Sequence, residues 1–184
     1  LDFAGNVRQQ LRTTYDYPMP DAIFEFLKDG LETLLSGLTA KQQGRVCGIG
    51  IGRPFELWKW HDLTGAAAEE FQSWQDVDFA TEVACFSELP VFVVNDATAA
   101  CQAEHMFGRG KDFRDYAYFF IGSFIGGGVA MNGTVFEGNR GNAGALGSMR
   151  TTGPLGESLQ LIDTASLHLL EARLVEAGIG PEIL

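Results

Sequence analysis

The sequence VNDATAA, residues 94–100, joins a short apolar run at residues 90–94 to an alanine-rich segment. The apolar run predicts a buried strand, and the segment after it predicts a helix over residues 98–107 that ends at Gly108. Asp96 therefore stands between a strand and a helix, at the strand end where the clefts of α/β proteins open. This stretch predicts an α/β chain with a small-molecule site.

A second informative stretch is IGSFIGGG, residues 121–128, which follows an apolar run at residues 116–121. The run predicts a strand. The glycines after it, Gly126, Gly127 and Gly128, have no side chains to keep a phosphate or a sugar away from the backbone N–H groups. A phosphate-binding loop is one interpretation of these glycines, and a tight hairpin bend is the other.

Asp96 and its neighbour Asn95 are the candidate site residues of the first stretch. A carboxylate at this position can act as a general base that takes a proton from a ligand hydroxyl. The alternative is that Asp96 is the N-cap of the following helix, where its oxygen accepts backbone N–H bonds. Asn95 is interpreted either as an amide that binds a hydroxyl or as a turn residue.

The remaining sequence alternates helical and extended patterns without an internal repeat. A tight hairpin is predicted at Asn132-Gly133, between strands at residues 129–131 and 134–136. Asp21 is expected to cap a helix whose apolar residues recur at helical spacing. The other predicted elements are a strand at 7–15, a strand at 45–51, a helix at 78–89, a glycine-rich loop at 139–154 and an amphipathic helix at 159–177.

The composition excludes several classes of function. The formal charge is −11 and the 13 basic residues are scattered, which disfavours a nucleic-acid surface. No apolar run approaches the roughly 20 residues that span a bilayer, so we expect a soluble, cytoplasmic protein without a membrane anchor. Both ends of the sequence resemble cuts within a larger fold, and we expect a fragment.

Metal binding is not expected from the cysteines and histidines. The three cysteines, Cys47, Cys85 and Cys101, form no CxxC pair and are interpreted as buried thiols of a reducing compartment. The three histidines, at positions 61, 105 and 168, share no metal-ligand spacing. We expect the tryptophans at positions 58, 60 and 74 to pack in a core rather than to stack on a sugar.

Four motifs in this order and spacing resemble the ROK family of repressors, open reading frames and sugar kinases. They are the sequences of residues 93–100, 121–129, 131–133 and 141–148. The resemblance covers about residues 45–171 and implies an actin-like, RNase H-like ATPase fold with two lobes, incomplete in this chain. Residues 1–111 would form the small lobe without its first strand and phosphate loop, and residues 116–184 would begin the larger lobe.

The resemblance also implies roles for the candidate site residues. Asn95 matches the asparagine that contacts the sugar, and Asp96 matches the catalytic base of the family's kinases. Residues 126–128 match the glycine-rich phosphate loop. The family pattern has Gly-Thr-Gly before the isoleucine, whereas this chain has Gly122-Ser123-Phe124, so Phe124 fills a position that is usually bare.

Further along the chain the sequence departs from the family pattern. The Glu-x-Gly-His motif falls on residues 145–148, so that a sugar-binding glutamate becomes Ala145 and a zinc- and sugar-binding histidine becomes Ser148. A second sugar-binding glutamate becomes Ile162. Residues 149–160 contain no cysteine where the family has its zinc loop, and the Asp-x-Gly-Gly-Thr phosphate loop is absent from this stretch.

These departures favour the effector-sensing domain of a ROK transcriptional regulator, a non-enzyme, over a sugar kinase. The regulator would bind a small-molecule effector, a sugar or a derivative, and would need no cofactor or metal. DNA would be bound only through a helix-turn-helix outside this chain, and a homodimer or tetramer is expected. The alternatives are an ATP- and Mg-dependent hexose or amino-sugar kinase with Asp96 as base, and an inactive domain kept for dimerisation.

Overall fold

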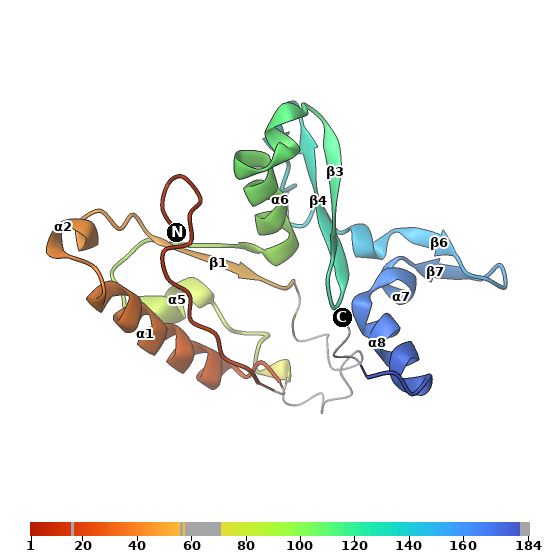
Figure 1. Ribbon diagram of the computed structural model, residues 1–184, viewed down its shortest axis with the longest axis horizontal. Helices are drawn as coiled ribbons and strands as arrows, with labels where there is room; N and C mark the ends of the chain where they lie inside the picture. The colour runs from red at the N-terminus through yellow and green to blue at the C-terminus, as the bar shows by residue number, and fades with distance from the viewer. Residues whose placement is uncertain (16, 56, 58–70, 181–184) are drawn as a thin grey trace. The chain divides into compact units, whose positions relative to one another are not determined.

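The computed structural model describes residues 1–15, 17–55, 57 and 71–180, in two compact units, residues 1–94 and 95–184. Figure 1 shows the helices and strands of both units, which are described separately below. The predicted lobe boundary near residues 108–115 lies within the second unit, and the assignment of residues 1–111 and 116–184 to two lobes stays a prediction. No helix in these described ranges is long and apolar enough to cross a membrane.

The longest helix of the first unit is α1, Pro20–Ser36, and its position follows from the predicted apolar spacing. Pro20 occupies the first helical position, where its fixed φ and missing N–H are tolerated. The predicted cap was wrong: Met19 is the N-cap residue, and Asp21 lies inside the first turn. An acidic side chain in the first turn still interacts favourably with the helix dipole.

The two strands of the first unit are β1, Ile49–Arg53, and β2, Val91–Asn95, and they form a two-stranded sheet. The strand predicted at residues 90–94 is therefore present, but it is not buried, because Phe92 is 66% exposed. The short helices are α2, Ala40–Gln43, and α5, Phe79–Ala84, the second capped by Asp78. The helix predicted over residues 78–89 thus ends five residues early.

The strand predicted at residues 7–15 was wrong, since this segment carries no strand assignment. A strand is stabilised by hydrogen bonds to a neighbour, and the sheets of the described residues consist of other segments. An alternating sequence pattern does not show whether a partner strand is available for pairing.

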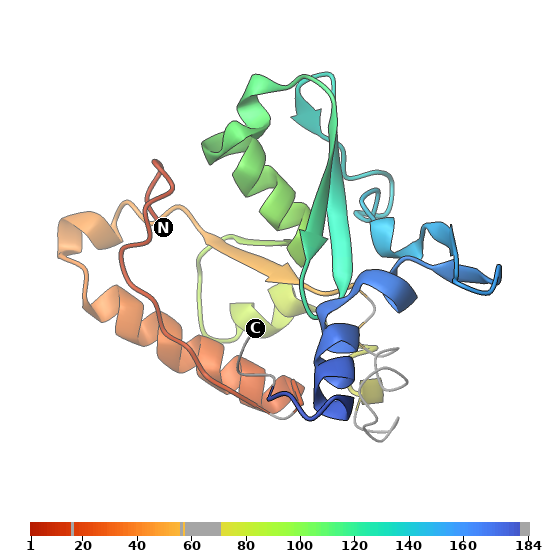
Figure 2. The same cartoon turned by 45° about the vertical axis from the view of Figure 1, so that its right-hand side comes forward.

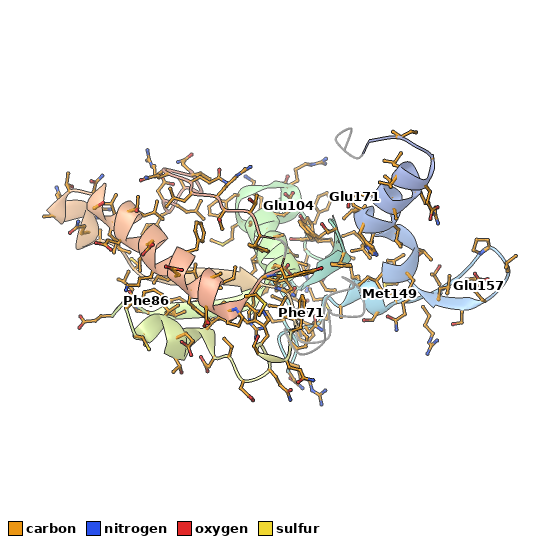
Figure 3. All side chains as sticks on the ribbon, turned by 90° about the horizontal axis from the view of Figure 1, so that it is seen from below. Phe71, Phe86, Glu104, Met149, Glu157 and Glu171 are labelled. Carbon is orange, nitrogen blue, oxygen red and sulfur yellow. The ribbon has the colours of Figure 1, made fainter. Side chains whose placement is uncertain are left out.

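An aromatic cluster forms the core of the first unit. Phe71, labelled in Figure 3, is 1% exposed, and Trp74 stacks on Phe79 with ring centroids 5.4 Å apart. Phe24 of α1 contacts Phe79 at 5.1 Å. Trp74 is therefore a packing residue, as predicted, whereas Trp58 and Trp60 lie outside the described residues.

The second unit begins with helix α6, Asp96–Phe107, followed by a 3-10 turn, η2, Arg109–Asp112. Strands β3, Tyr116–Ile121, β4, Ile125–Met131, and β5, Thr134–Val135, form an antiparallel sheet in the order β3-β4-β5. Helix α6 packs along β4, as both views show (Figures 1 and 2).

The hairpin predicted at Asn132-Gly133 is confirmed. These two residues have φ values of 55° and 73° and join β4 to β5, as the right-handed twist of a two-residue hairpin requires. The strand predicted at residues 129–131 is longer than expected, because β4 already begins at Ile125.

The last part of the chain differs most from the prediction. Residues 139–154, predicted as loop, include η3, Leu146–Ser148, and strand β6, Arg150–Thr152. The single helix predicted over residues 159–177 is instead β7, Ser158–Gln160, α7, Ile162–Ala165, and α8, Leu167–Glu176. Strands β6 and β7 pair as a hairpin, and Glu157 in its loop is labelled in Figure 3.

The break between α7 and α8 has a tertiary cause. Ser166 is extended, with φ −82° and ψ 145°, and is 3% exposed. Its hydroxyl donates to the carbonyl of Ile162 at 2.8 Å and accepts the N–H of Ile125 from β4 at 3.1 Å. A partner 41 residues away therefore interrupts the helical pattern.

Candidate functional site

Asn95, the last residue of β2, is the N-cap of α6. Its side-chain oxygen accepts the backbone N–H of Thr98 at 3.0 Å and the hydroxyl of Thr98 at 3.3 Å. The interpretation of Asp96 as the N-cap was therefore wrong, because Asn95 holds that position. Binding of a ligand hydroxyl by Asn95 stays a prediction. The capping oxygen is occupied, while the side-chain amide of Asn95 points to the neighbouring carboxylate.

Asp96 is the first residue of α6, and its half-buried carboxylate is held on one side only. Its Oδ1 accepts the N–H of Ala97 at 2.8 Å and the side-chain amide of Asn95 at 3.1 Å. No residue of the described ranges donates a hydrogen bond to Oδ2. One fixed oxygen and one open oxygen are an arrangement suited to accepting a ligand hydroxyl or its proton.

The three glycines predicted to form a phosphate loop lie inside strand β4. Gly126, Gly127 and Gly128 pair with Phe120, Phe119 and Tyr118 of β3, so they form neither a loop nor the bend of a hairpin. Their lack of side chains serves packing, because a Cβ on Gly128 would meet the side chain of Cys101 in α6.

The other two glycines of the triplet are packed in the same way. A Cβ on Gly126 would lie 3.0 Å from that of Ala97, and one on Gly127 would lie 2.5 Å from the side chain of Leu146. The glycines therefore let α6 and the η3 turn approach the two faces of β4, which places the start of α6 beside the start of this strand.

The connection between β3 and β4 is the turn Gly122-Ser123-Phe124, and the start of α8 holds it. The carbonyl of Gly122 accepts the N–H of Leu167 at 3.0 Å. The carbonyl of Ser123 accepts the backbone N–H of His168 at 3.2 Å and lies 2.8 Å from its ring Nδ1. Sequence reasoning considered His168 only as a metal ligand and missed this contact.

The positions where the sequence departs from the family pattern lie near one another. A Cβ on the buried Gly147 would lie 3.5 Å from the Cβ of Ile162, so the η3 turn and the start of α7 are adjacent. Ala145 and Ile162 are half-buried and Ser148 is exposed. None of the three side chains is a carboxylate or an imidazole.

A polar chain connects α6 to the sheet behind the candidate site. The hydroxyl of Tyr116 lies 3.2 Å from Nδ1 of His105, and Nε2 of the same ring lies 3.0 Å from the carbonyl of Gly133. Because the carbonyl only accepts, Nε2 donates to it, and the Tyr116 hydroxyl donates to Nδ1. Desolvation, reinforced by Cys101, raises the pKa of Tyr116 to about 12.

The donor set offers no metal site in the described parts of the chain. They contain no group of three or more His, Cys, Asp or Glu side chains able to hold a metal ion, and His61 lies outside them. All three cysteines are free; only Cys101 is buried, so the prediction of three buried thiols was wrong for Cys47 and Cys85. Desolvation raises the pKa of the Cys101 thiol.

Comparison with known proteins gives one family. The model of the ROK family matches residues 3–158. A putative xylose repressor of Caldicellulosiruptor sp. (strain Rt8B.4) is 30% identical over 172 residues, 89% of this chain and 42% of the repressor. The bifunctional enzyme NanE/NanK of Brucella melitensis is 45% identical over 89 residues, 48% of this chain and 17% of the enzyme.

A solved structure supports the same fold. The ROK family glucokinase from Streptomyces griseus, in complex with glucose and AMPPNP, superposes with a TM-score of 0.71 at 22% identity. The match covers 97% of this chain and 57% of the glucokinase. The predicted α/β, actin-like ATPase fold, present in part, is thereby confirmed. The chain spans less than half the length of the two curated relatives described above.

Proposed function

Because the chain belongs to the ROK family, we propose that it forms the effector-sensing part of a ROK transcriptional regulator whose sugar-kinase site has degenerated. The observation that carries the proposal is the set of side chains at Ala145, Ser148 and Ile162, where the family pattern has two glutamates and a histidine. A sugar hydroxyl that loses its buried partner costs about 1–3 kcal/mol. Three such changes together weaken the binding of a hexose relative to a kinase of the family, so we expect weak binding without phosphorylation.

Two further observations support a regulator. The putative xylose repressor matches 89% of this chain, a longer stretch than the match to the NanE/NanK enzyme. Residues 149–160 contain neither cysteine nor histidine, and they form the β6–β7 hairpin instead of a zinc loop. Residues 149–160 therefore lack the donors of a zinc loop, and we propose no resident metal there.

The proposed ligand is a small neutral molecule, a sugar or a sugar derivative, bound by Asn95 and Asp96. The open Oδ2 of Asp96 accepts a ligand hydroxyl. The N-terminus of α6, the positive end of the helix dipole, stabilises the charge of this carboxylate. Binding at residues 126–128 belongs to the same proposal. The ladder with β3 occupies one edge of this part of the β4 backbone. The regulator would work in the cytoplasm as a homo-oligomer and bind DNA through a helix-turn-helix outside this chain.

A sugar kinase is the second candidate, and the geometry of Asp96 favours it. Its carboxylate is oriented by Ala97 and Asn95 and keeps one open oxygen, as a base in phosphoryl transfer requires. The kinase would use ATP and Mg as co-substrate and metal, and it would phosphorylate a hexose or an amino sugar.

Incubation of the full-length protein with MgATP and a panel of hexoses distinguishes the two candidates. We expect no phosphorylated sugar from the wild type, and hexose binding without turnover in calorimetry. Sugar phosphorylation that Asp96→Asn abolishes would establish the kinase and refute the regulator as sole function. Asp78→Asn is the matched control, because Asp78 caps α5 in the first unit and lies outside the proposed site.

A further inference from the structure

We propose that His168 is a positioning residue for the candidate site: it holds the β3–β4 turn, Gly122-Ser123-Phe124, against the start of helix α8. The inference rests on the proposed function only in treating this turn as the border of the ligand site. The hydrogen bonds and ring contact that carry it are independent of any ligand.

The β3–β4 turn caps helix α8 through backbone hydrogen bonds. Ser166 is the N-cap residue of this helix, but its side chain makes no capping bond, because its hydroxyl serves Ile125 and Ile162. The first N–H groups of α8, those of Leu167 and His168, donate instead to the carbonyls of the turn. Movement of the turn would therefore leave helix N–H groups without partners.

The side chain of His168 adds the specific part of the contact. Its Nδ1 lies 2.8 Å from the Ser123 carbonyl, which can only accept, so the ring carries its proton on Nδ1. The ring also packs against Phe124, with centroids 4.7 Å apart and planes at 50°. One side chain thus binds the middle residue of the turn by a hydrogen bond and its last residue by a ring contact.

The turn is joined directly to the residues proposed to bind the ligand. Ile125 follows it, and its N–H is held by Ser166 at 3.1 Å. Gly126 comes next and lies against Ala97, the residue after Asp96. A displaced turn would shift the start of β4 and, through Gly126, the packing around the carboxylate of Asp96.

Amide hydrogen exchange of the full-length protein tests the proposal without a ligand. The reporters are the amides of Ile125 and Leu167, which are bonded across the contact. In His168→Ala we expect both to exchange about fivefold faster, as the loss of one hydrogen bond worth about 1 kcal/mol predicts. His168→Asn places an amide donor near the position of Nδ1 and should restore most of the protection. His168→Phe keeps a ring but lacks the donor and should not.

His105→Asn is the matched control. His105 also joins a helix to this hairpin, through Tyr116 and Gly133 at the opposite end of β3 and β4, so its replacement should leave the two reporters unchanged. Wild-type exchange rates in His168→Ala, or equal rates in the Asn and Phe variants, would overturn the proposal. If His168→Ala does not fold, the exchange rates of His168→Asn and His168→Phe are compared with each other and decide whether the side-chain donor holds the turn.

Glucose titration of the same variants provides a second readout. His168→Ala should weaken glucose binding about tenfold, and His168→Asn should retain it, because the loosened turn must be ordered again on binding. A wild type that binds no hexose of the panel contradicts the proposed function, and the exchange rates still decide the role of His168.

Discussion

The side-chain oxygen of Asn95 lies 3.0 Å from the backbone nitrogen of Thr98 and accepts its hydrogen, which fixes the start of helix α6. Asp96 is thereby released from capping and keeps one carboxylate oxygen open. Asn95 thus ends the strand and caps the helix, whereas Asp96 is the residue proposed to accept the ligand.

Asn95→Ala removes the cap and should lower the free energy of unfolding by about 1 kcal/mol. Asn95→Ser should recover most of this loss, because a hydroxyl oxygen can accept the same N–H. Urea denaturation followed by circular dichroism measures both. An alanine variant as stable as the wild type would show that Thr98 does not depend on this bond.

Gly128→Ala tests the close approach of α6 to strand β4. Its Cβ would lie 2.6 Å from Sγ of Cys101, closer than van der Waals contact allows, so the helix must move. Overpacking of this kind costs about 1–3 kcal/mol, measurable as a loss of unfolding free energy.

Gly50→Ala is the matched control, since a Cβ on Gly50 meets no atom within 4 Å. We expect a change of less than about 0.5 kcal/mol there, as for exposed substitutions in general. Equal effects of the two variants would mean that the glycine at position 128 is not required by packing.

Tyr116 gives the stability a dependence on alkaline pH. The unfolded chain releases the tyrosine proton near pH ~10, whereas the folded chain holds it until its pKa of about 12. Stability is therefore complete below pH ~10 and falls as the pH rises through this interval, because the unfolded state binds fewer protons than the folded one. The raised pKa of Cys101 acts in the same direction.

Tyr116→Phe should accordingly flatten the decline of the melting temperature above pH ~10. At neutral pH the variant should be about 1 kcal/mol less stable than the wild type, since His105 loses the hydroxyl bond. Thermal melts from pH 7 to 11.5 measure both effects. A decline as steep in Tyr116→Phe as in the wild type would assign the alkaline sensitivity to other groups.

Features that depend on nearby residues could be predicted from the sequence. The Asn132-Gly133 turn, strand β3 and the Gly108 end of α6 follow from local steric and hydrogen-bonding preferences. The strand expected at residues 7–15 failed because pairing requires a partner strand, which the periodicity does not identify.

The candidate site shows the same limit. The junction of strand and helix at residues 95 and 96 could be predicted, because a strand end followed by a helix is a local pattern. The division of roles within the pair could not, since Asn and Asp cap helices equally well. The contact of His168 with Ser123 joins residues 45 positions apart, and no short motif indicates it.

Ser166→Ala should reveal how much the break between α7 and α8 contributes to stability. The buried hydroxyl binds both the N–H of Ile125 and the carbonyl of Ile162, so its loss leaves a buried N–H without a partner and should cost about 1–3 kcal/mol. Ser158→Ala, which removes an exposed hydroxyl that accepts from Arg150, is the control and should change stability by less than about 0.5 kcal/mol. Denaturant unfolding of the two variants compares them directly. A Ser166→Ala protein as stable as the control would mean that the helical pattern of residues 159–177 is interrupted by something other than this hydroxyl.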